Sequence, residues 1–147
     1  MTFDYPLWSD PDFTLIRHES EIPWLILHLN REFREYSQIP APLRYRLADL
    51  LALIEEEMLA YYRPVKINIA SFGNHLPRQH WHIMARFRED SRFPEPMWAE
   101  PLRDAKPVLL PFAPFASRLK ERLANFGSDD ALTSSASETQ KGTPAST

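Results

Sequence analysis

The chain has 147 residues, of which 44% are hydrophobic and 12% aromatic, enough for one domain with a buried core and too few for two. It contains no cysteine, which excludes disulfides, thiolate metal ligands and a cysteine nucleophile. The formal net charge is -3, and the segment 127–147 accounts for -2 of it through three acidic residues and one lysine. The body that remains is near neutral, which argues against a general nucleic-acid binder.

The first 29 residues predict an arm and two strands. Met1–Asp12 mixes aromatic residues with prolines and aspartates, and we expect an extended arm without a regular element. The β-favouring runs Phe13–His18 and Pro23–Leu29, separated by polar residues, predict two antiparallel strands. His18 and His28 lie in these strands without a spacing that chemistry requires, so we interpret them as solvated edge imidazoles or as partners of backbone groups.

The strongest helix signal in the chain opens at Pro40 and Pro42 and must stop before Pro64, which forces Arg63 out of helical geometry. Its apolar residues recur at three- and four-residue steps, so one face of the helix is expected to cover a sheet. These residues are Leu43, Leu47, Leu50, Leu51, Ile54, Met58 and Tyr61.

The remaining elements complete one domain, residues 1–126. Val65–Ser71 alternates like a strand. After the next strand, a proline-rich apolar segment is expected to wrap the body, and its part Pro107–Phe115 to meet a second subunit. Ser117–Phe126 predicts a short closing helix. The tail, residues 127–147, has too little apolar surface to offset its ordering entropy and is expected to be disordered.

No secretory leader is visible, and apolar runs such as Trp24–Leu27 are far shorter than a membrane span. We therefore expect a cytoplasmic protein with no membrane partner.

Chemistry is visible in one stretch, Asn68–Phe87 (NIASFGNHLPRQHWHIMARF). From His80 onward the residues alternate as in a strand, so one face is hydrophobic and the opposite face carries His80 and His82. Arg86 lies on that same face, two steps beyond Met84. We expect this imidazole-bearing surface to be the functional site.

A His-x-His pair on a strand has three interpretations. The first is structural, two half-exposed histidines on a solvated sheet face. The second is a metal site, for which His75 is the only nearby third ligand, and we assign no metal or other cofactor. The third is phosphate chemistry: Gly73 permits a close backbone approach, and Asn74, His75 and Arg78 come up beside the histidines. A neutral imidazole is a fair nucleophile toward phosphorus.

Several separated segments carry a family resemblance. Gly73-Asn74, Leu76 and the run RQHWHIMAR that begins at Arg78 resemble the signature of the histidine triad (HIT) superfamily, His-x-His-x-His followed by apolar residues. The segments IPWLIL, KINIASFGN and RFREDSRFPEPMW are similar to the bacterial HIT branch often labelled diadenosine tetraphosphate hydrolase-like. The resemblance implies an α+β HIT-like fold: an antiparallel sheet of about five strands, one long helix and a short C-terminal helix.

The resemblance also implies roles for matching residues. His80 falls on the nucleophile that attacks the α-phosphate to give a nucleotidyl-histidine, and His82 on the histidine that hydrogen-bonds phosphate oxygens. Asn74 falls on an amide or hydroxyl position that contacts the phosphate. Two positions depart: Arg78 replaces the first histidine of the triad, and Trp24 replaces a further, upstream histidine. An arginine carries a fixed positive charge and can donate two parallel hydrogen bonds, but it cannot act as an acid or base.

These residues predict an enzyme, a HIT-type nucleotide hydrolase or nucleotidyl transferase that cleaves a phosphoanhydride or phosphoramidate of a purine nucleotide, such as a dinucleoside polyphosphate. The family implies a homodimer. The alternative is a HIT-fold nucleotide-binding module with weak or no catalysis, in which the arginine fills the phosphate pocket. We expect the substrate and its phosphates to be contacted by Gly73, Asn74, Arg78, Asn68 and Trp24. The pocket walls are expected to include Trp24, Leu25 and Phe13.

Overall fold

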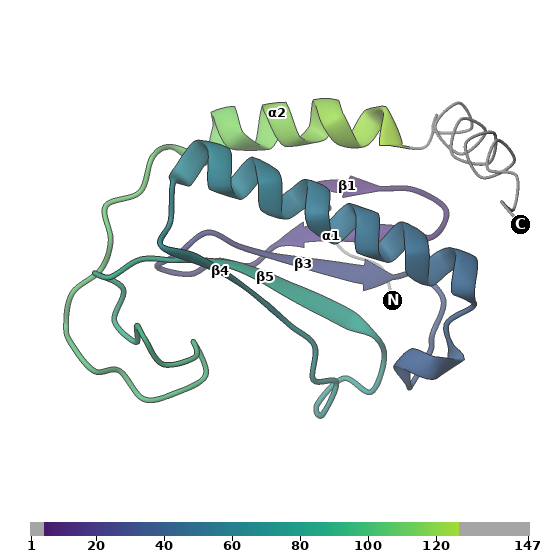
Figure 1. Cartoon of the computed structure of the whole chain (residues 1–147), viewed down its shortest axis with the longest axis horizontal. Coiled ribbons are helices and arrows are strands. Elements are labelled where there is room, and N and C mark those ends of the chain that lie inside the picture. The colour runs from purple at the N-terminus through teal and green to yellow at the C-terminus, as the bar shows by residue number, and fades with distance from the viewer. Residues whose placement is uncertain (1–4, 127–147) are drawn as a thin grey trace, which may run out of the picture.

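The strands form one antiparallel sheet in the computed structural model, which describes residues 5–126. Their order across the sheet is β1-β2-β3-β5-β4 (Figure 1). The expected α+β class is confirmed, with two α-helices packed on one face. In chain order the elements are β1 (Trp8–Ser9), β2 (Phe13–Arg17), β3 (Trp24–Leu29), a 3-10 helix η1 (Tyr36–Gln38), α1 (Ala41–Tyr62), β4 (Lys66–Ala70), β5 (His80–Arg86) and α2 (Phe112–Ala124).

The long helix α1 has the ends that its prolines predict. Pro40 precedes the first helical residue and Pro42 lies in the first turn, where a missing N–H costs no intrahelical hydrogen bond. At the other end Arg63 takes a left-handed conformation, with φ 49 and ψ 52, immediately before Pro64. Pro64 excludes the helical region for the residue before it, so the chain turns there into β4.

The main core lies between this helix and the sheet (Figure 1). Leu47, Leu50 and Ile54 of α1 are buried against the sheet, and Trp81 and Ile83 of β5 point toward them. The hydrophobic face predicted for β5 therefore lies under the helix. The second helix, α2, adds Phe115, Ala116, Leu119 and Leu123 as buried residues.

Two predictions about the chain ends need correction. The N-terminal arm does contain a regular element, because Trp8 and Ser9 pair with Leu15 and Thr14 as the short edge strand β1. The last helix begins at Phe112 and not at Ser117, because its Pro114 falls in the first turn, where proline is tolerated.

The opposite face of the sheet is only partly open. The chain beyond β5 folds back across this face and covers Met84 and Arg86, which are both 1% exposed. A second apolar cluster lies beneath it and contains Ile22, Trp24, Ile26, Met84 and Met97.

A buried ion pair holds this returning segment in place. Arg86 Nε and Nη2 donate to the two carboxylate oxygens of Asp90 at 2.9 and 3.0 Å, and Arg86 Nη2 also donates to the Glu95 carbonyl at 2.6 Å. Backbone N–H groups of Phe87, Arg92 and Phe93 donate to the same carboxylate. Burial raises the pKa of Asp90, but the hydrogen bonds from Arg86 and the backbone outweigh it and lower the pKa overall.

The expected disordered tail, residues 127–147, lies outside the described residues, and so do the first four residues of the arm. Neither helix of the described part of the chain has the length and apolar character needed to cross a bilayer.

The substitution Asp90→Ala tests the role of this ion pair. It leaves the Arg86 guanidinium buried without its carboxylate, so we expect the free energy of unfolding to fall by about 3–5 kcal/mol. Chemical denaturation measures this change, with Glu89→Ala at the exposed neighbouring position as the control. A loss below about 1 kcal/mol would contradict a structural role for the pair.

Candidate functional site

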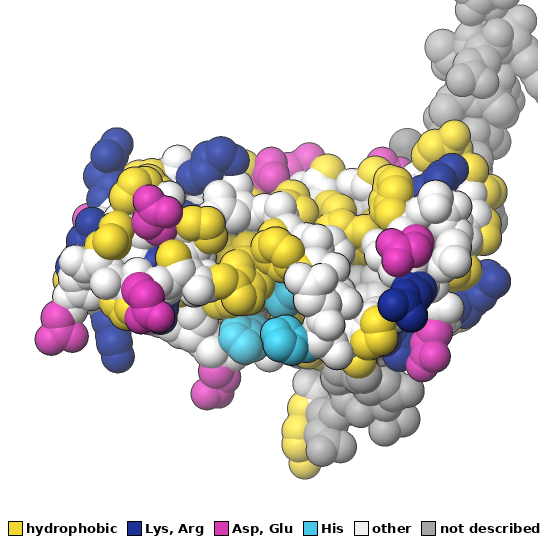
Figure 2. All heavy atoms as spheres, turned by 90° about the horizontal axis from the view of Figure 1, so that it is seen from below, with side chains coloured by type: hydrophobic (Ala, Val, Ile, Leu, Met, Phe, Trp, Pro, Cys, Tyr) yellow, Lys and Arg dark blue, Asp and Glu magenta, His cyan; other side chains and the backbone are white. Residues whose placement is uncertain are grey.

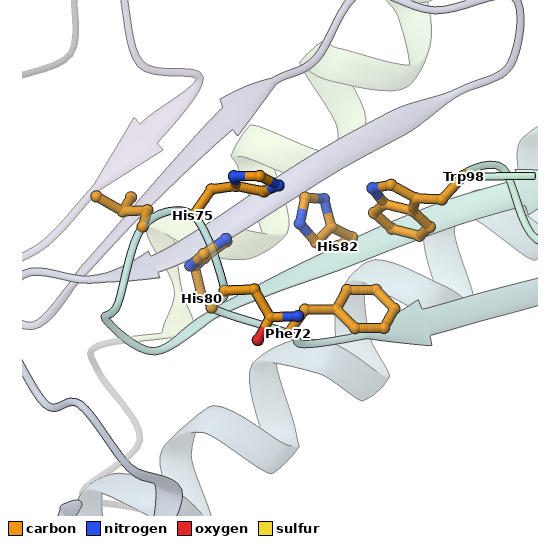
Figure 3. A pocket seen from close by; sticks show the side chains of 8 residues that line it. Phe72, His75, His80, His82 and Trp98 are labelled. Atoms are coloured by element: carbon orange, nitrogen blue, oxygen red, sulfur yellow. The ribbon is translucent and has the colours of Figure 1, made fainter.

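His80 and His82 line one pocket of about 440 Å³ on the sheet face opposite the helices. Figure 2 shows histidine side chains gathered near the middle of this face, next to hydrophobic ones. The close-up in Figure 3 shows His82 between His80 on one side and Trp98 on the other. The lining residues are Phe72, Gly73, Asn74, His75, Leu76, His80, His82 and Trp98.

His80 is the first residue of β5, and a hydrogen bond to a nearby backbone carbonyl orients its ring. Its Nδ1 lies 2.8 Å from the Arg78 carbonyl oxygen. Because a carbonyl only accepts, Nδ1 carries the proton and donates it, which leaves the lone pair of the neutral ring on Nε2. The side chain is 9% exposed, and Ser71 Oγ donates to the His80 carbonyl at 2.6 Å. The ring is therefore held in a single orientation at the pocket wall.

His82 is held by a different partner. The Trp24 indole Nε1 donates to His82 Nδ1 at 3.0 Å across the β3–β5 pair. The ring centroids of His80 and His82 are 5.3 Å apart. Burial, followed by the neighbouring rings of His80 and His18, lowers the pKa of His82 to about 4. His82 is therefore neutral at physiological pH.

The loop before β5 brings two polar side chains to the pocket. Gly73 has φ +72, a left-handed conformation that favours glycine. Asn74 and His75 follow it in the pocket lining. Figure 3 places the His75 ring over His80, so the pocket has a third imidazole even though the first triad position is an arginine. The sequence predicted His75 beside the two histidines, either as a third metal ligand or as part of a phosphate site, and the pocket lining confirms its position.

Arg78 points away from the pocket. Its Nη2 donates to the Leu29 and Asn30 carbonyls at 2.7 and 3.1 Å, and its Nη1 lies 3.3 Å from a carboxylate oxygen of Glu32. The side chain is only 7% exposed. Arg78 therefore contributes its backbone carbonyl to the site, as the acceptor for His80 Nδ1, while its guanidinium binds at the end of β3.

Two other predicted contacts also lie outside the pocket lining. The Asn68 side-chain oxygen accepts from Arg86 Nη1 at 2.9 Å and lies in a neighbouring hollow. Trp24 is 8% exposed and reaches the site only through His82. Leu25 and Phe13, expected as pocket walls, are buried in the main core under the helices, because their side chains point to the helix-covered face.

Aromatic rings form the far wall of the pocket. Trp98 and Phe72 are 50% and 58% exposed, and their rings pack edge to face with centroids 4.8 Å apart. Trp98 also meets the His82 ring at 5.0 Å. The sequence placed Trp98 in the wrapping segment without a site role, since only the tertiary fold brings it to β5.

His28 and His18 lie closer to the site than predicted. His28 pairs with His80 across β3 and β5, and the two rings stack with centroids 5.1 Å apart. His28 is 5% exposed on a central strand, so the interpretation as a solvated edge imidazole is wrong for it. Burial, then His80, Arg78 and His82, lowers the pKa of His28 to about 4. His18 packs against Trp24 with ring centroids 4.4 Å apart and the rings tilted by 51°.

Within residues 5–126, no group of three or more His, Asp or Glu side chains is arranged to hold a metal ion. The metal interpretation of the two histidines thus finds no third ligand among these residues.

Solved structures of histidine triad proteins are similar to this chain. One from Bradyrhizobium japonicum aligns with a TM-score of 0.66 and 22% identity over 80% of this chain and 88% of its own. One from Marinobacter aquaeolei has a TM-score of 0.63 and 23% identity, over 78% of this chain and 90% of its own. One from Sinorhizobium meliloti has a TM-score of 0.63 and 25% identity, over 79% of this chain and 87% of its own. No protein-family model matches the chain, and no curated protein matches it significantly.

The sheet, the helices and the His-x-His strand thus define a protein of the histidine triad fold. The resemblance of the sequence to the HIT superfamily is confirmed by these structures. The diadenosine tetraphosphate hydrolase-like branch stays a prediction.

The lowered pKa values of His28 and His82 predict a stability that depends on pH. Their folded pKa values of about 4 lie below the ordinary 6.5, so the unfolded chain binds more protons between these values. Stability is therefore full above about pH 6.5 and falls as the pH drops toward 4. At pH 5 we expect a loss of at most about 2 kcal/mol for each histidine.

Chemical denaturation between about pH 7 and pH 5 measures the slope. His28→Leu should flatten it, whereas His75→Gln, at an exposed position, should leave it unchanged. An identical slope in wild type and His28→Leu would show that His28 does not stay neutral in the folded protein.

Proposed function

We propose that this chain is a HIT-type nucleotide hydrolase or nucleotidyl transferase, acting in the cytoplasm on a small-molecule nucleotide through a nucleotidyl-histidine on His80. The substrate would be a phosphoanhydride or phosphoramidate of a purine nucleotide, of the dinucleoside polyphosphate kind. The observation that carries the proposal is the bond between His80 Nδ1 and the Arg78 carbonyl at 2.8 Å. It leaves an unprotonated Nε2 on a ring that lines a pocket with two further imidazoles.

The reaction follows from that lone pair. His80 Nε2 attacks the α-phosphorus, the N–P bond forms, and the bond from phosphorus to the leaving group breaks as that group takes a proton from solvent. Water then attacks the same phosphorus, the N–P bond breaks, and the ring recovers its lone pair while the proton of the water is released. The imidazole thus splits one substitution into two easier ones.

The remaining pocket groups would serve the phosphate oxygens. His82 would donate a hydrogen bond to a nonbridging oxygen, where negative charge shifts during transfer. Asn74 and the backbone at Gly73 would contact the phosphate from the loop. None of the eight lining residues is a lysine or an arginine, so recognition would rest on neutral donors.

The position of Arg78 bears on the alternative of a binding module without catalysis. That alternative requires the guanidinium to fill the phosphate pocket and block attack. The guanidinium is instead occupied by the Leu29 and Asn30 carbonyls and by Glu32. This arrangement supports the catalytic proposal over the alternative, because Arg78 is not among the residues that line the pocket of His80.

His80→Ala should abolish covalent labelling by a dinucleoside polyphosphate and lower turnover by orders of magnitude, roughly 10³-fold or more, because no lone pair remains to attack. Nucleotide affinity should change modestly, since His82 and the loop are retained. Mass spectrometry of the acid-quenched wild-type reaction should find a nucleotidyl adduct on His80. Hydrolysis at a normal rate with no adduct at this residue would contradict the proposal.

His82→Ala should give a different result, a loss of about one hundredfold in turnover with the adduct still detectable after acid quench. The substitution removes a donor and leaves the nucleophile in place. A chelator should have little effect on wild type, since the proposal assigns no metal to the bond-breaking step. Complete loss of the adduct in His82→Ala would instead assign the attack to His82.

We also propose a homodimer. The expected contact segment, Pro107–Phe115, is divided in the fold: Phe115 is buried in the core, whereas Val108 and Leu110 are exposed. Sedimentation at tens of micromolar, well above the dissociation constant of a typical stable homodimer, should therefore give a dimer, which Val108→Asp weakens. A monomer at that concentration would contradict the proposal.

A further inference from the structure

Trp24 makes one polar contact whose direction is fixed by chemistry. An indole N–H only donates, so in the 3.0 Å bond from Trp24 Nε1 the Nδ1 of His82 must be the acceptor. A neutral imidazole that accepts on Nδ1 carries its proton on Nε2. Trp24, on the neighbouring strand β3, therefore determines which ring nitrogen of His82 carries the proton.

We propose that Trp24 is a positioning residue that holds His82 in the tautomer with the proton on Nε2, so that this histidine meets the substrate as a hydrogen-bond donor. Its catalytic consequence rests on the proposed function. The tautomer itself does not, since it is a property of the protein without substrate.

The two pocket histidines then have opposite tautomers. His80 donates from Nδ1 to a carbonyl and retains its lone pair on Nε2, whereas His82 accepts on Nδ1 and presents N–H at Nε2. One ring is thus set up to attack and the other to donate. The two roles are not interchangeable while Trp24 and the Arg78 carbonyl stay in place.

The indole is held firmly enough to impose this choice. The tilted ring of His18 packs against it with centroids 4.4 Å apart, and Trp98 meets it edge to face at 5.3 Å. Trp24 is 8% exposed and packs in the cluster with Ile26 and Met97. The lowered pKa of His82 agrees with this arrangement, because a doubly protonated ring would turn an N–H toward the indole N–H.

The test is the tautomer of His82, measured on the full chain without substrate by long-range ¹H–¹⁵N correlation of the histidine side chains, assigned with His82→Gln. Wild type should show His82 with Nδ1 unprotonated and Nε2 protonated. In Trp24→Phe, which keeps a ring and removes the donor, Nδ1 should become partly or wholly protonated. If this variant does not fold, the benzothienyl analogue of tryptophan, with sulfur in place of N–H, serves the same purpose.

Trp98→Phe is the matched control, because Trp98 also meets His82 through its ring and its loss should leave the tautomer unchanged. A wild-type His82 protonated on Nδ1, or the same tautomer with and without the Trp24 N–H, would overturn the proposal.

Kinetics give the second readout. With a dinucleoside polyphosphate, Trp24→Phe should lower kcat about tenfold or more and change KM by less than about threefold, because donation matters most in the transition state. A tautomer that shifts while kcat is unchanged would overturn the catalytic part of the proposal. If wild type shows no turnover at all, the proposed function fails, and the tautomer measurement still decides the role of Trp24.

Discussion

The antiparallel register between β3 and β5 determines which side chains surround the two histidines of the motif. His28 pairs with His80 and Ile26 with His82, so Trp24, two residues before Ile26, is a diagonal neighbour of His82. A slip of one residue would turn every side chain of one strand to the other face. It would place Trp81 and Ile83 over the pocket and bury the imidazoles under α1. The hydrophobic residues Trp81, Ile83 and Ala85, which alternate along β5 and are buried in the main core, favour this register.

The site depends on histidines held by directional bonds. His80 donates to a carbonyl and His82 accepts from an indole. The Arg78 guanidinium is tied to the end of β3, and the Arg78 carbonyl accepts from His80. An arginine at the first triad position is compatible with this arrangement because the position contributes its carbonyl. The loop residue His75 adds an imidazole that the strand no longer supplies.

Much of the fold was predictable because it rests on local signals. The prolines around α1, the three- and four-residue apolar steps and the alternation of β5 set the helix and the faces of the sheet. The predicted strand runs match β2 to β5 within a residue at each end. The short strand β1 was missed because two residues form it only through pairing with β2. The start of α2 was missed because Pro114 was taken as a sign of irregular chain.

The site was predictable only in part. His80, His82, Asn74 and Gly73 line the pocket as a short motif allows, since neighbours in sequence stay neighbours on a strand and its loop. The orientation of Arg78, the bond from Trp24 and the wall formed by Trp98 depend on strand pairing and on the returning segment anchored by Arg86 and Asp90. No local pattern encodes them. The stacking of His28 on His80 follows from the register between two strands far apart in the chain.

The proposed reaction requires His80 Nε2 to face the α-phosphorus of a bound nucleotide. A crystal structure of the full chain with a hydrolysis-resistant dinucleoside polyphosphate would test this requirement. We expect an α-phosphorus within about 3–3.5 Å of His80 Nε2, with a nonbridging oxygen in hydrogen-bond reach of His82. A nucleotide bound in another hollow, or a His80 ring whose Nε2 is turned away from the phosphorus, would contradict it.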